Sequence, residues 1–560
     1  MNNAVFDVIV VGSGITGGWA AKEFCEKGFK TLLLERGPAV EHGKYPTEHS
    51  SPWNMPFRGT GDPLKFSTAY AGHAGAISGL TEYAEDFYVK DSEEPYQLAP
   101  DTQFSWVRGY QLGGKSLIWG RHTPRFSPMD FEANARDGHG GAWPIRYDDV
   151  AKWYDYVEDF IGVSGQTEGL AHYPDGRYLP PFELTAVEKQ LKQSMQTTDP
   201  GRCLTIGRTA NLTRPHRGRS PCMSRLHCQR GCSLGAYFST QSSTLPAARA
   251  TGNLTVLTDT IVESLEYDAG SRRVSAVRVI DVKSRTRRRI AARTVFVCAS
   301  SFNSVQLLLN SRSPTNPNGL GGNSGVLGKY VLDHVMGAYV EATTDRFADL
   351  YTSGNRPTPF VIPRFANLDT NAKDFDRGYF FWGQTYRLGW SRGIFSPGAG
   401  AAFKASLGKP GPWMISMNTC GEMLPRANNV LTLDERHVDR HGIPQLTISF
   451  RFSDNEKSMM RDAEREGLRM IRAAGFRVLS SSAEVLSGGR LHEMGGARMG
   501  ADPAQSVLNS RNQCHDAANV FVTDGAAFPS GSCYNPSLTY MALTARACEF
   551  AANQMSEGKL

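Results

Sequence analysis

Three cysteines lie close together near the middle of the sequence. The stretch reads Cys-Met-Ser-Arg-Leu-His-Cys-Gln-Arg-Gly-Cys and holds Cys222, Cys228 and Cys232. Clustered thiolates beside arginines can have lowered pKa values, and they suit a soft metal ion or an iron–sulfur cluster. A [4Fe–4S] cluster normally takes four ligands, whereas a [3Fe–4S] cluster needs three. The alternatives are a zinc ion with His227 as fourth ligand and structural thiols that bind nothing.

A histidine and an asparagine near the end of the chain could activate a hydroxyl group. His492 opens the run His-Glu-Met-Gly-Gly, and Asn535 precedes Pro536. An imidazole with an unperturbed pKa near 6.5 is available as a neutral base at physiological pH. The amide of Asn535 cannot act as a base, but it can bind a hydroxyl and hold it in line. An isolated histidine is more often a core or surface residue, yet this setting favours His492 as a base.

The first forty residues predict the element that would position a ligand for this chemistry. Four apolar residues, Val8–Val11, are typical of a strand buried on both faces. The range Trp19–Lys27 predicts a helix, and Lys30–Leu34 predicts a second strand. The glycine pattern G-x-G-x-x-G lies between the first strand and the helix, so the whole is a βαβ unit.

Each residue of the glycine pattern has a physical role in dinucleotide binding. Gly12 permits the tight turn, Gly14 lets a pyrophosphate approach the backbone, and Gly17 lets the helix pack on the strand. The helix N-terminus attracts phosphates, and Glu35 stands where a carboxylate can accept hydrogen bonds from ribose hydroxyls. The alternative is a glycine-rich turn that binds nothing.

Length and composition exclude several classes of protein. At 560 residues the chain is long enough for two or more domains. A net charge of +6 is small for this length, and no basic patch alternates with aromatics, so we expect no nucleic-acid partner. No window of about 18 apolar residues occurs, so we expect no membrane span. The first predicted strand begins within a few residues of the N-terminus, so we expect no secretory leader.

Further motifs follow the βαβ unit in an order that resembles a known family. A second glycine stretch, Arg108–Gly120, precedes the helix start at Trp143-Pro144. The C-terminal part carries Leu491–Gly500, then Val520–Gly525, and then Cys533–Thr539 before a last predicted helix, Tyr540 to Gln554. In this order the motifs resemble the glucose–methanol–choline (GMC) family of FAD oxidoreductases, over most of the chain except its middle.

The resemblance implies an α+β fold of two parts. One part is a Rossmann-like FAD-binding domain built from discontinuous segments, and the other is an antiparallel-sheet substrate domain that covers the flavin. We assign residues 1–334 to the FAD-binding domain, including a cysteine-rich loop at 220–234 (the cysteine loop). Residues 335–485 form the predicted substrate domain, and residues 486–560 return to the FAD-binding domain.

The resemblance also implies roles for single residues. His492 and Asn535 match the pair that faces the flavin N5, and Asp524 matches the residue near the FAD pyrophosphate or ribityl chain. Pro536 sets the start of the last helix, whose N-terminus would face the flavin pyrimidine ring. Relatives that tether flavin covalently have a histidine near Ile118, so we expect non-covalent FAD. Further cofactor contacts are expected at Arg108, Gly113, Gly114 and Ser116.

Two residues in the predicted substrate domain are candidates for sugar contacts. Aromatic rings stack on pyranose faces and amides bind hydroxyls, which suggests Trp382 and Gln384. Both could equally be ordinary sheet residues. A helix is predicted over Asn303–Asn310. The family usually has a glycine just before it, near Ser300-Ser301, which this sequence lacks.

The cysteine loop indicates which members of the family this sequence resembles most. Its spacing matches the catalytic subunits of bacterial FAD-dependent glucose dehydrogenases, and the stretch Gly235–Ala248 is more similar still to those of glucoside 3-dehydrogenases. The resemblance implies oxidation of the C3 hydroxyl of a glycoside to a ketone, with electrons leaving through a [3Fe–4S] cluster to a cytochrome c. It also implies a small accessory subunit whose export signal would carry this chain to the periplasm; without co-export we expect a cytoplasmic location.

Three alternatives stay open at this point. The first is an oxygen-using sugar or C-glycoside oxidase of the same fold. The second is a non-catalytic flavin and iron–sulfur electron carrier, which would need no base at position 492. The third is a different alcohol substrate, such as a polyol or a sterol.

Overall fold

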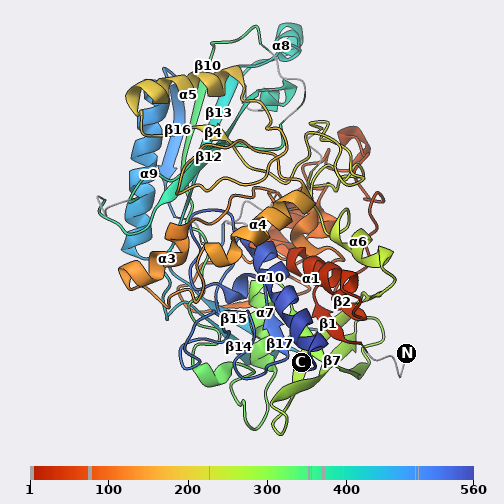
Figure 1. Cartoon of the computed structure of the whole chain (residues 1–560). Coiled ribbons are helices and arrows are strands. Elements are labelled where there is room, and N and C mark those ends of the chain that lie inside the picture. The colour runs from red at the N-terminus through yellow and green to blue at the C-terminus, as the bar shows by residue number, and fades with distance from the viewer. Residues whose placement is uncertain are drawn as a thin grey trace.

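The computed structural model describes most of the chain. The described ranges are 6–73, 79–225, 228–350, 354, 356–368, 373–394, 396–485, 487–489 and 491–560. Within them the molecule has a lower body around a parallel sheet and an upper body around an antiparallel sheet (Figure 1). Both termini lie at the lower body (Figure 1).

The lower body is built on a five-stranded parallel sheet. Its strand order is β17-β9-β1-β2-β5, and every neighbouring pair is parallel. All four residues of β1 and β2 are buried, as expected for strands covered on both faces. The sheet gathers segments that lie far apart in the sequence: β1 (Val8–Val11), β2 (Thr31–Leu34), β5 (Leu254–Leu257), β9 (Thr294–Val297) and β17 (Val520–Val522).

Four helices of the lower body, α1, α4, α6 and α10, form one packed group (Figure 1). The helix α1 (Ile15–Glu26) contacts α6 (Thr244–Ala250) and α10 (Ser537–Ser556), and α10 in turn contacts α4 (Asp148–Ile161). The predicted βαβ unit is confirmed, but α1 begins four residues earlier than Trp19. The reason is that its glycines are helical: close packing against Gly12 and Thr240 leaves no room for a Cβ.

Two other helices also begin earlier than the sequence pattern predicts. The helix α10 starts at Ser537 rather than Tyr540, because Pro536 is its N-cap and a proline suits a helix start. The helix α7 (Ser301–Asn310) starts two residues before the predicted Asn303. Its N-cap, Ser300, has φ +77°, in the region that usually requires glycine.

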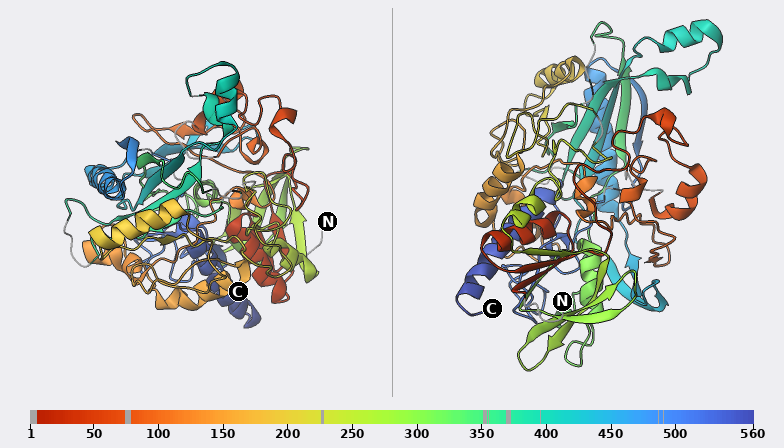
Figure 2. Two further views of the ribbon diagram at one scale, coloured as in Figure 1. Left: turned by 90° about the horizontal axis from the view of Figure 1, so that it is seen from above. Right: turned by 90° about the vertical axis from the view of Figure 1, so that its right-hand side faces the viewer.

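The upper body is a six-stranded antiparallel sheet in the order β16-β10-β13-β12-β11-β4. The long amphipathic helix α9 packs on β10, β13 and β16, and α5 packs on α9. The short helix α8 projects from the far end of this body (Figure 2, right). The bounds are β4 (Thr205–Ile206), β10 (Ala338–Thr344), β11 (Phe360–Ile362), β12 (Tyr379–Arg387), β13 (Trp413–Gly421), β16 (Arg477–Ala483), α5 (Ala186–Thr198), α8 (Gly400–Leu407) and α9 (Asp454–Ala473).

Two three-stranded sheets complete the fold. In one, β14 (Val430–Val438) pairs with β15 (Pro444–Ser449), which pairs in parallel with β3 (Gln97–Leu98). In the other, consecutive antiparallel strands β6, β7 and β8 form a meander. The remaining elements are α2 (Pro63–Ala69), α3 (Pro128–Asp137), β6 (Thr260–Asp268), β7 (Arg273–Asp281) and β8 (Arg287–Ala291).

The predicted fold class is confirmed, but the predicted range 335–485 does not coincide with the six-stranded sheet. The helix α5 and strand β4 precede residue 335 and yet belong with that sheet. The hairpin β14–β15 lies inside the range and yet pairs with β3 and packs on α7. Both deviations arise because the chain crosses between the two bodies more often than local sequence patterns reveal.

None of the helices in the described ranges combines the length and apolar character needed to cross a lipid bilayer.

Candidate active site

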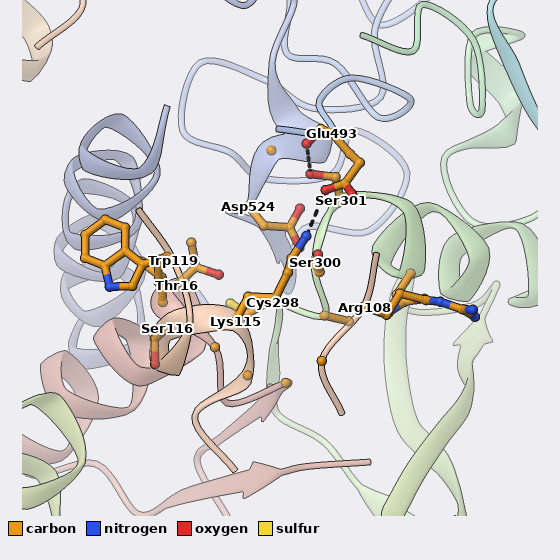
Figure 3. A pocket seen from close by; sticks show the side chains of 18 of the residues that line it. Thr16, Arg108, Lys115, Ser116, Trp119, Cys298, Ser300, Ser301, Glu493 and Asp524 are labelled. Atoms are coloured by element: carbon orange, nitrogen blue, oxygen red, sulfur yellow. Dashed lines mark hydrogen bonds and ion pairs between the residues drawn. The ribbon is translucent and has the colours of Figure 1, made fainter. Parts of the chain in front are cut away.

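A large cavity between the two bodies collects residues from distant parts of the chain. Its lining comes from the first glycine loop, the second glycine stretch, the start of α7, strand β12 and the C-terminal motifs. Figure 3 shows side chains of the first glycine loop, the second glycine stretch, the start of α7 and the C-terminal motifs around the cavity. The ends of β1 and β9 open onto it, as ligand sites of open parallel sheets usually do.

The first glycine loop has the shape that a dinucleotide requires. Gly12 has φ +92°, and a Cβ there would lie 2.5 Å from the carbonyl oxygen of Cys298. A Cβ on Gly17 would lie 1.8 Å from the carbonyl oxygen of Gly12, so Gly17 holds α1 against the turn and does not line the cavity. Gly14 lines the cavity with open space on its Cβ side, at the N-terminal end of α1. This backbone can therefore receive a pyrophosphate.

Glu35 lies at the end of β2 and faces the same cavity. Its carboxylate accepts hydrogen bonds from the backbone N–H groups of Ser13 (3.1 Å) and Gly37 (2.9 Å), and from the Ser13 hydroxyl. Burial raises the pKa of Glu35 in spite of these donors. A carboxylate has about four acceptor positions, so it can still receive ribose hydroxyls.

The second glycine stretch folds against the first. Gly113 and Gly114 both have positive φ values, and a Cβ on Gly114 would lie 3.2 Å from the Cα of Gly14. Ser116 donates its hydroxyl to the Gly113 carbonyl and lines the cavity. Arg108 also lines it, and its guanidinium is held by Asp91 at 2.7 Å. Gly113 itself lies behind the lining and shapes the turn.

Asp524 is buried and lines the cavity close to Ser300 and Cys298 (Figure 3). It accepts hydrogen bonds from the Ser304 hydroxyl and from the backbone N–H of Ala526 at 3.0 Å. Burial raises the pKa of Asp524 to about 6. Ser300 and Ser301 line the cavity beside it.

A half-buried ion pair, which the sequence motifs did not suggest, also lies in the wall. Lys115 Nζ and Glu493 Oε2 are 2.9 Å apart (Figure 3). Lys115 stands between the two predicted contacts Gly114 and Ser116, and Glu493 follows His492 directly. The pair therefore ties the second glycine stretch to the segment that carries the histidine.

Four polar side chains, His122, His334, His492 and Asn535, form what we call the histidine cluster. The Nε2 of His492 is 3.2 Å from Nδ2 of Asn535, and the Oδ1 of Asn535 is 2.9 Å from Nδ1 of His122. The Nδ1 of His334 is 2.8 Å from Nδ1 of His492. The cluster thus joins three segments of the chain, and His122, His492 and Asn535 line the cavity.

The upper sheet forms the wall opposite the glycine loops. Alternate residues of β12 point to opposite faces of the sheet, so Trp382 and Gln384 share one face. Both line the cavity, whereas Tyr379 and Phe381 pack in the core under α9. The structure therefore places both candidate sugar contacts where a substrate could reach them.

The cysteine loop lies beside the cavity but contributes no sulfur to its wall. Gln229, the residue after Cys228, lines the cavity. The Cys222 sulfur accepts the backbone N–H of Ser224 at 3.4 Å, and the Cys232 sulfur accepts backbone N–H groups from the turn that follows it. Burial raises the pKa of both thiols.

The sulfur positions disfavour a single zinc ion bound by these cysteines. Three thiolates on one tetrahedral zinc ion would stand about 3.8 Å apart. Among the described residues, the one group of three such ligand atoms within 4.8 Å of one another is His334, Cys420 and His492, not the cysteine loop. A cluster binds its thiolates to different irons, so it spans a wider set. His227, the alternative zinc ligand, lies outside the described residues.

Buried anchors hold the cysteine loop to the N-terminal part of the chain. Glu48 is fully buried and accepts hydrogen bonds from the backbone N–H and the hydroxyl of Ser233, both at 2.9 Å. It also pairs with Arg225 at 3.1 Å. The ring of Tyr45 packs directly on Gly231, where a Cβ would lie 2.2 Å from the ring.

The structure brings most of the predicted site residues to one cavity. Those that line it are Gly12, Gly14, Glu35, Arg108, Gly114, Ser116, Trp382, Gln384, His492, Asp524 and Asn535. Gly17, Gly113 and Pro536 shape the backbone behind the wall, and the three cysteines lie to one side. Sequence reasoning missed His122, His334, Lys115 and Glu493; only the last two adjoin a recognised motif.

The sequence matches a family model described as GMC oxidoreductase over residues 6–336, and a second model with the same description over residues 425–544. One relative is the 2-methyl-1,2-propanediol dehydrogenase of Mycolicibacterium austroafricanum, 26% identical, with 98% of this chain and 96% of the relative covered. Another is the fructose dehydrogenase large subunit of Gluconobacter japonicus, 23% identical, with 99% and 98% covered.

A third relative is the 6'''-hydroxyparomomycin C oxidase of Streptomyces lividus, 26% identical, with 99% of this chain and 92% of the relative covered. Among solved structures, the fold is similar to that of the pyridoxine 4-oxidase from Mesorbium loti. The TM-score is 0.61 at 16% identity, with 99% of both chains covered, so this likeness concerns the fold.

Proposed function

The chain belongs to the GMC oxidoreductase family and acts on sugar or alcohol hydroxyls, and on that premise we propose that it is an FAD-dependent dehydrogenase of glucosides. The hydroxyl oxidised is that on C3, and the product is a 3-keto-glycoside. The bound FAD is non-covalent, because Ile118 stands where a tethering histidine would be expected.

The observation that supports this proposal is the continuity of the cavity. One space runs from Gly14, where a pyrophosphate fits, to His492 and Asn535, and on to Trp382 and Gln384. A flavin nucleotide and a sugar can therefore occupy the same cavity, with the histidine cluster at their meeting point. The fit to FAD rests on the glycine cradle, on Glu35 for the ribose and on Asp524 beside the start of α7.

FAD, when bound, supplies the redox chemistry by accepting a hydride from the carbinol carbon. The residues of the chain handle the proton. The imidazole of His492 takes the hydroxyl proton at Nε2, and the amide of Asn535 holds the hydroxyl in line. Hydride and proton together account for the two electrons and two hydrogens that leave the alcohol as it becomes a ketone.

The sugar substrate and its C3 position are inferred from the upper wall and from sequence likeness. Trp382 offers a ring for a pyranose face and Gln384 offers an amide for hydroxyls, both on the cavity side of β12. The stretch Gly235–Ala248 resembles glucoside 3-dehydrogenases, which suggests C3 as the site of attack.

We further propose that Cys222, Cys228 and Cys232 hold a [3Fe–4S] cluster. Three sulfurs suit the three ligands of such a cluster, and backbone N–H groups donate to two of them, as is usual around cluster thiolates. A cluster beside the cavity would let electrons leave one at a time to a cytochrome c. Gln229, the residue after Cys228, lines the cavity, which supports a short distance between a cluster on this loop and a flavin in the cavity.

The partners and location follow as proposals of the same kind. A relative named as a large subunit supports a small accessory subunit for this chain as well. An export signal on that subunit would carry the complex to the periplasm. Co-expression of the chain with a candidate small subunit that carries an export signal, followed by fractionation, tests this; a wholly cytoplasmic chain would overturn it.

The decisive experiment purifies the protein anaerobically and measures iron, acid-labile sulfide and flavin. Methyl glucosides are then supplied either with a dye and cytochrome c or with oxygen as the only electron acceptor. The proposal expects dye and cytochrome reduction with a 3-keto product; protein with flavin but without sugar turnover would contradict it.

The second candidate is an oxygen-dependent sugar oxidase of the same family. The 6'''-hydroxyparomomycin C oxidase relative, similar over almost the whole chain, favours it. This candidate predicts stoichiometric hydrogen peroxide with each ketone and no dependence on the three cysteines.

A further inference from the structure

We propose that His334 is a positioning residue that fixes the tautomer of His492 with Nε2 unprotonated. The inference rests on the proposed role of His492 as base. It follows from the hydrogen-bond partners of two imidazoles whose nitrogens lie 2.8 Å apart.

The backbone around the two histidines is locked first. Leu332 and Met494 form an antiparallel bridge, with N–H to O distances of 2.8 and 2.9 Å. The Oδ1 of Asp333 accepts the backbone N–H groups of both His334 (2.8 Å) and His492 (3.1 Å). The two rings therefore meet edge to face at a fixed separation, with ring centroids 5.0 Å apart.

The outer nitrogen of His334 has partners that can only accept. Its Nε2 lies 2.9 Å from the carbonyl oxygen of Ser532 and 3.2 Å from that of Gly531. A carbonyl oxygen accepts and never donates, so the proton of the neutral ring must be on Nε2. The Nδ1 of His334 is then left with a lone pair.

That lone pair determines which nitrogen of His492 carries the proton. At 2.8 Å from the Nδ1 of His334, the Nδ1 of His492 must carry a proton and donate it. The Nε2 of His492 is then the acceptor, in agreement with the amide of Asn535, whose Nδ2 donates to it at 3.2 Å. The Oδ1 of Asn535 faces Nδ1 of His122, which completes a consistent direction of donation along the histidine cluster.

The tautomer of His492 needs no change during proton transfer, although the Asn535 amide, which donates to Nε2 in the substrate-free protein, must give up that bond to the substrate hydroxyl. When Nε2 of His492 accepts the substrate proton, Nδ1 still donates to His334, and the hydrogen bond becomes charge-assisted and stronger. Other charged or titratable groups near the pair are Asp333, which bonds the backbone of both histidines, Cys420 and Glu493. Asp333 carries a carboxylate that also favours the imidazolium.

The short separation argues against a metal ion between the rings, although Cys420 lies within 4.8 Å of both. Two nitrogens on one zinc ion would stand about 3.4 Å apart, given bonds near 2.1 Å and a tetrahedral angle. The observed 2.8 Å is a hydrogen-bond distance. Stoichiometric zinc in the purified enzyme, lost on mutation of Cys420, would overturn the proposal.

Three variants of the flavin-loaded enzyme test it. In His334→Phe the ring volume is kept and both nitrogens are lost. In His334→Asn a carboxamide oxygen can take the place of Nδ1 and accept from His492. In His334→Gln the longer amide reaches toward the Ser532 carbonyl instead. The matched control is His441→Phe, a buried histidine outside the cavity whose two nitrogens have no hydrogen-bond partner among the described residues.

The first readout is the rate of anaerobic flavin reduction at saturating glucoside. We expect a loss of about a hundredfold in His334→Phe, at the low end for general-base catalysis, with KM little changed. We expect His334→Asn to recover most of the rate, His334→Gln to recover little, and His441→Phe to match the wild type. Equal rates for the Asn and Gln variants would overturn the proposal, even if His334→Phe fails to fold.

The second readout needs no turnover. Diethyl pyrocarbonate modifies unprotonated imidazole nitrogen, so the pH dependence of His492 modification in substrate-free enzyme, followed by peptide mass spectrometry, reports its protonation. Loss of the acceptor should move the midpoint to lower pH in His334→Phe, and His334→Asn should restore it. An unchanged midpoint in a flavin-loaded His334→Phe would overturn the proposal. If no sugar reduces the wild-type flavin, the proposed function fails, and this curve still decides the role of His334.

Discussion

The histidine cluster and the cysteine loop lie at the same cavity but are organised differently. The cluster draws His122, His334, His492 and Asn535 from three separate segments and links them by hydrogen bonds of 2.8 to 3.2 Å. The cysteine loop takes its three sulfurs from one short segment, and the pKa values of Cys222 and Cys232 are raised by burial. Its hold on the rest of the chain comes from other residues, chiefly Glu48.

This contrast separates proton handling, which depends on the folded protein alone, from cluster binding, which also depends on the metal. The direction of donation in the histidine cluster is set by the protein itself, because the carbonyl oxygens beside Nε2 of His334 can only accept. The cysteine loop must lose protons to bind iron, so its final geometry is coupled to metal binding. The two regions should therefore fail independently, and the predictions below test that separation.

The largest effect is expected for His492→Ala, which removes the base. Flavin reduction by glucoside should fall by a factor of about 10² to 10⁴, the usual range for general acid–base catalysis. Rapid-mixing measurements under anaerobic conditions check the rate. Iron and flavin contents should stay at wild-type levels; a variant that keeps the wild-type rate would remove His492 from the mechanism.

The opposite pattern, a loss of iron with flavin reduction kept, is expected for Cys228→Ser. The variant should lose iron and its ability to reduce cytochrome c, because a cluster would lack one of its ligands. The sugar should still reduce the flavin at the wild-type rate, because His492 and Asn535 line the cavity and none of the three sulfurs of the loop does. Paired assays with cytochrome c and by direct flavin absorbance check both halves. Unchanged cytochrome reduction would show that electrons leave by another route.

Local sequence predicted the contiguous motifs, including the cysteine loop, better than it predicted the histidine cluster. The glycine loop, Glu35 and the cysteine spacing could be recognised because each is a contiguous motif with its own backbone requirement. His122 and His334 could not, because their roles depend on contacts with residues more than 150 positions away in sequence. The helix starts at Ser301 and Ser537 were also missed, since a serine with positive φ and a proline cap set them rather than apolar periodicity.

The extent of the six-stranded sheet could not be predicted from the sequence for a related reason. Strand β4 is only two residues long, and it joins the six-stranded sheet through pairing with β11, about 150 residues later. No hydrophobic pattern can identify a two-residue strand. The parallel strands β1 and β2, in contrast, are continuous apolar runs that sequence alone identifies.

A smaller, pH-dependent effect is expected for Asp524 in the flavin-free protein. Burial raises its pKa from 3.8 to about 6, so the folded state disfavours the charged form. The stabilising contribution is complete below about pH 4 and is lost as pH rises through 6, a change of about 3 kcal/mol. In Asp524→Asn this loss is absent, so the melting temperature of the variant relative to wild type should rise between pH 4 and pH 8. A difference that does not change with pH would contradict the assignment.

The smallest effect is expected for Glu48→Gln, which weakens the anchor of the cysteine loop. Loss of a buried carboxylate that accepts from Ser233 and pairs with Arg225 should lower the free energy of unfolding by about 1 to 3 kcal/mol. Thermal unfolding and iron content check it, and iron should fall while sugar-driven flavin reduction persists. The matched control is Glu41→Gln, an exposed glutamate paired with Lys44, which should change neither quantity.

The central claim is that one cavity holds FAD and a sugar with His492 between them as the base. An anaerobic single turnover tests it most directly: the purified enzyme is mixed with excess methyl glucoside, and bound flavin and ketone are counted. The account predicts one flavin reduced for each ketone formed, with borodeuteride trapping placing the carbonyl at C3. A flavin that stays oxidised with every glucoside and related alcohol, or a protein that binds no FAD, would contradict it.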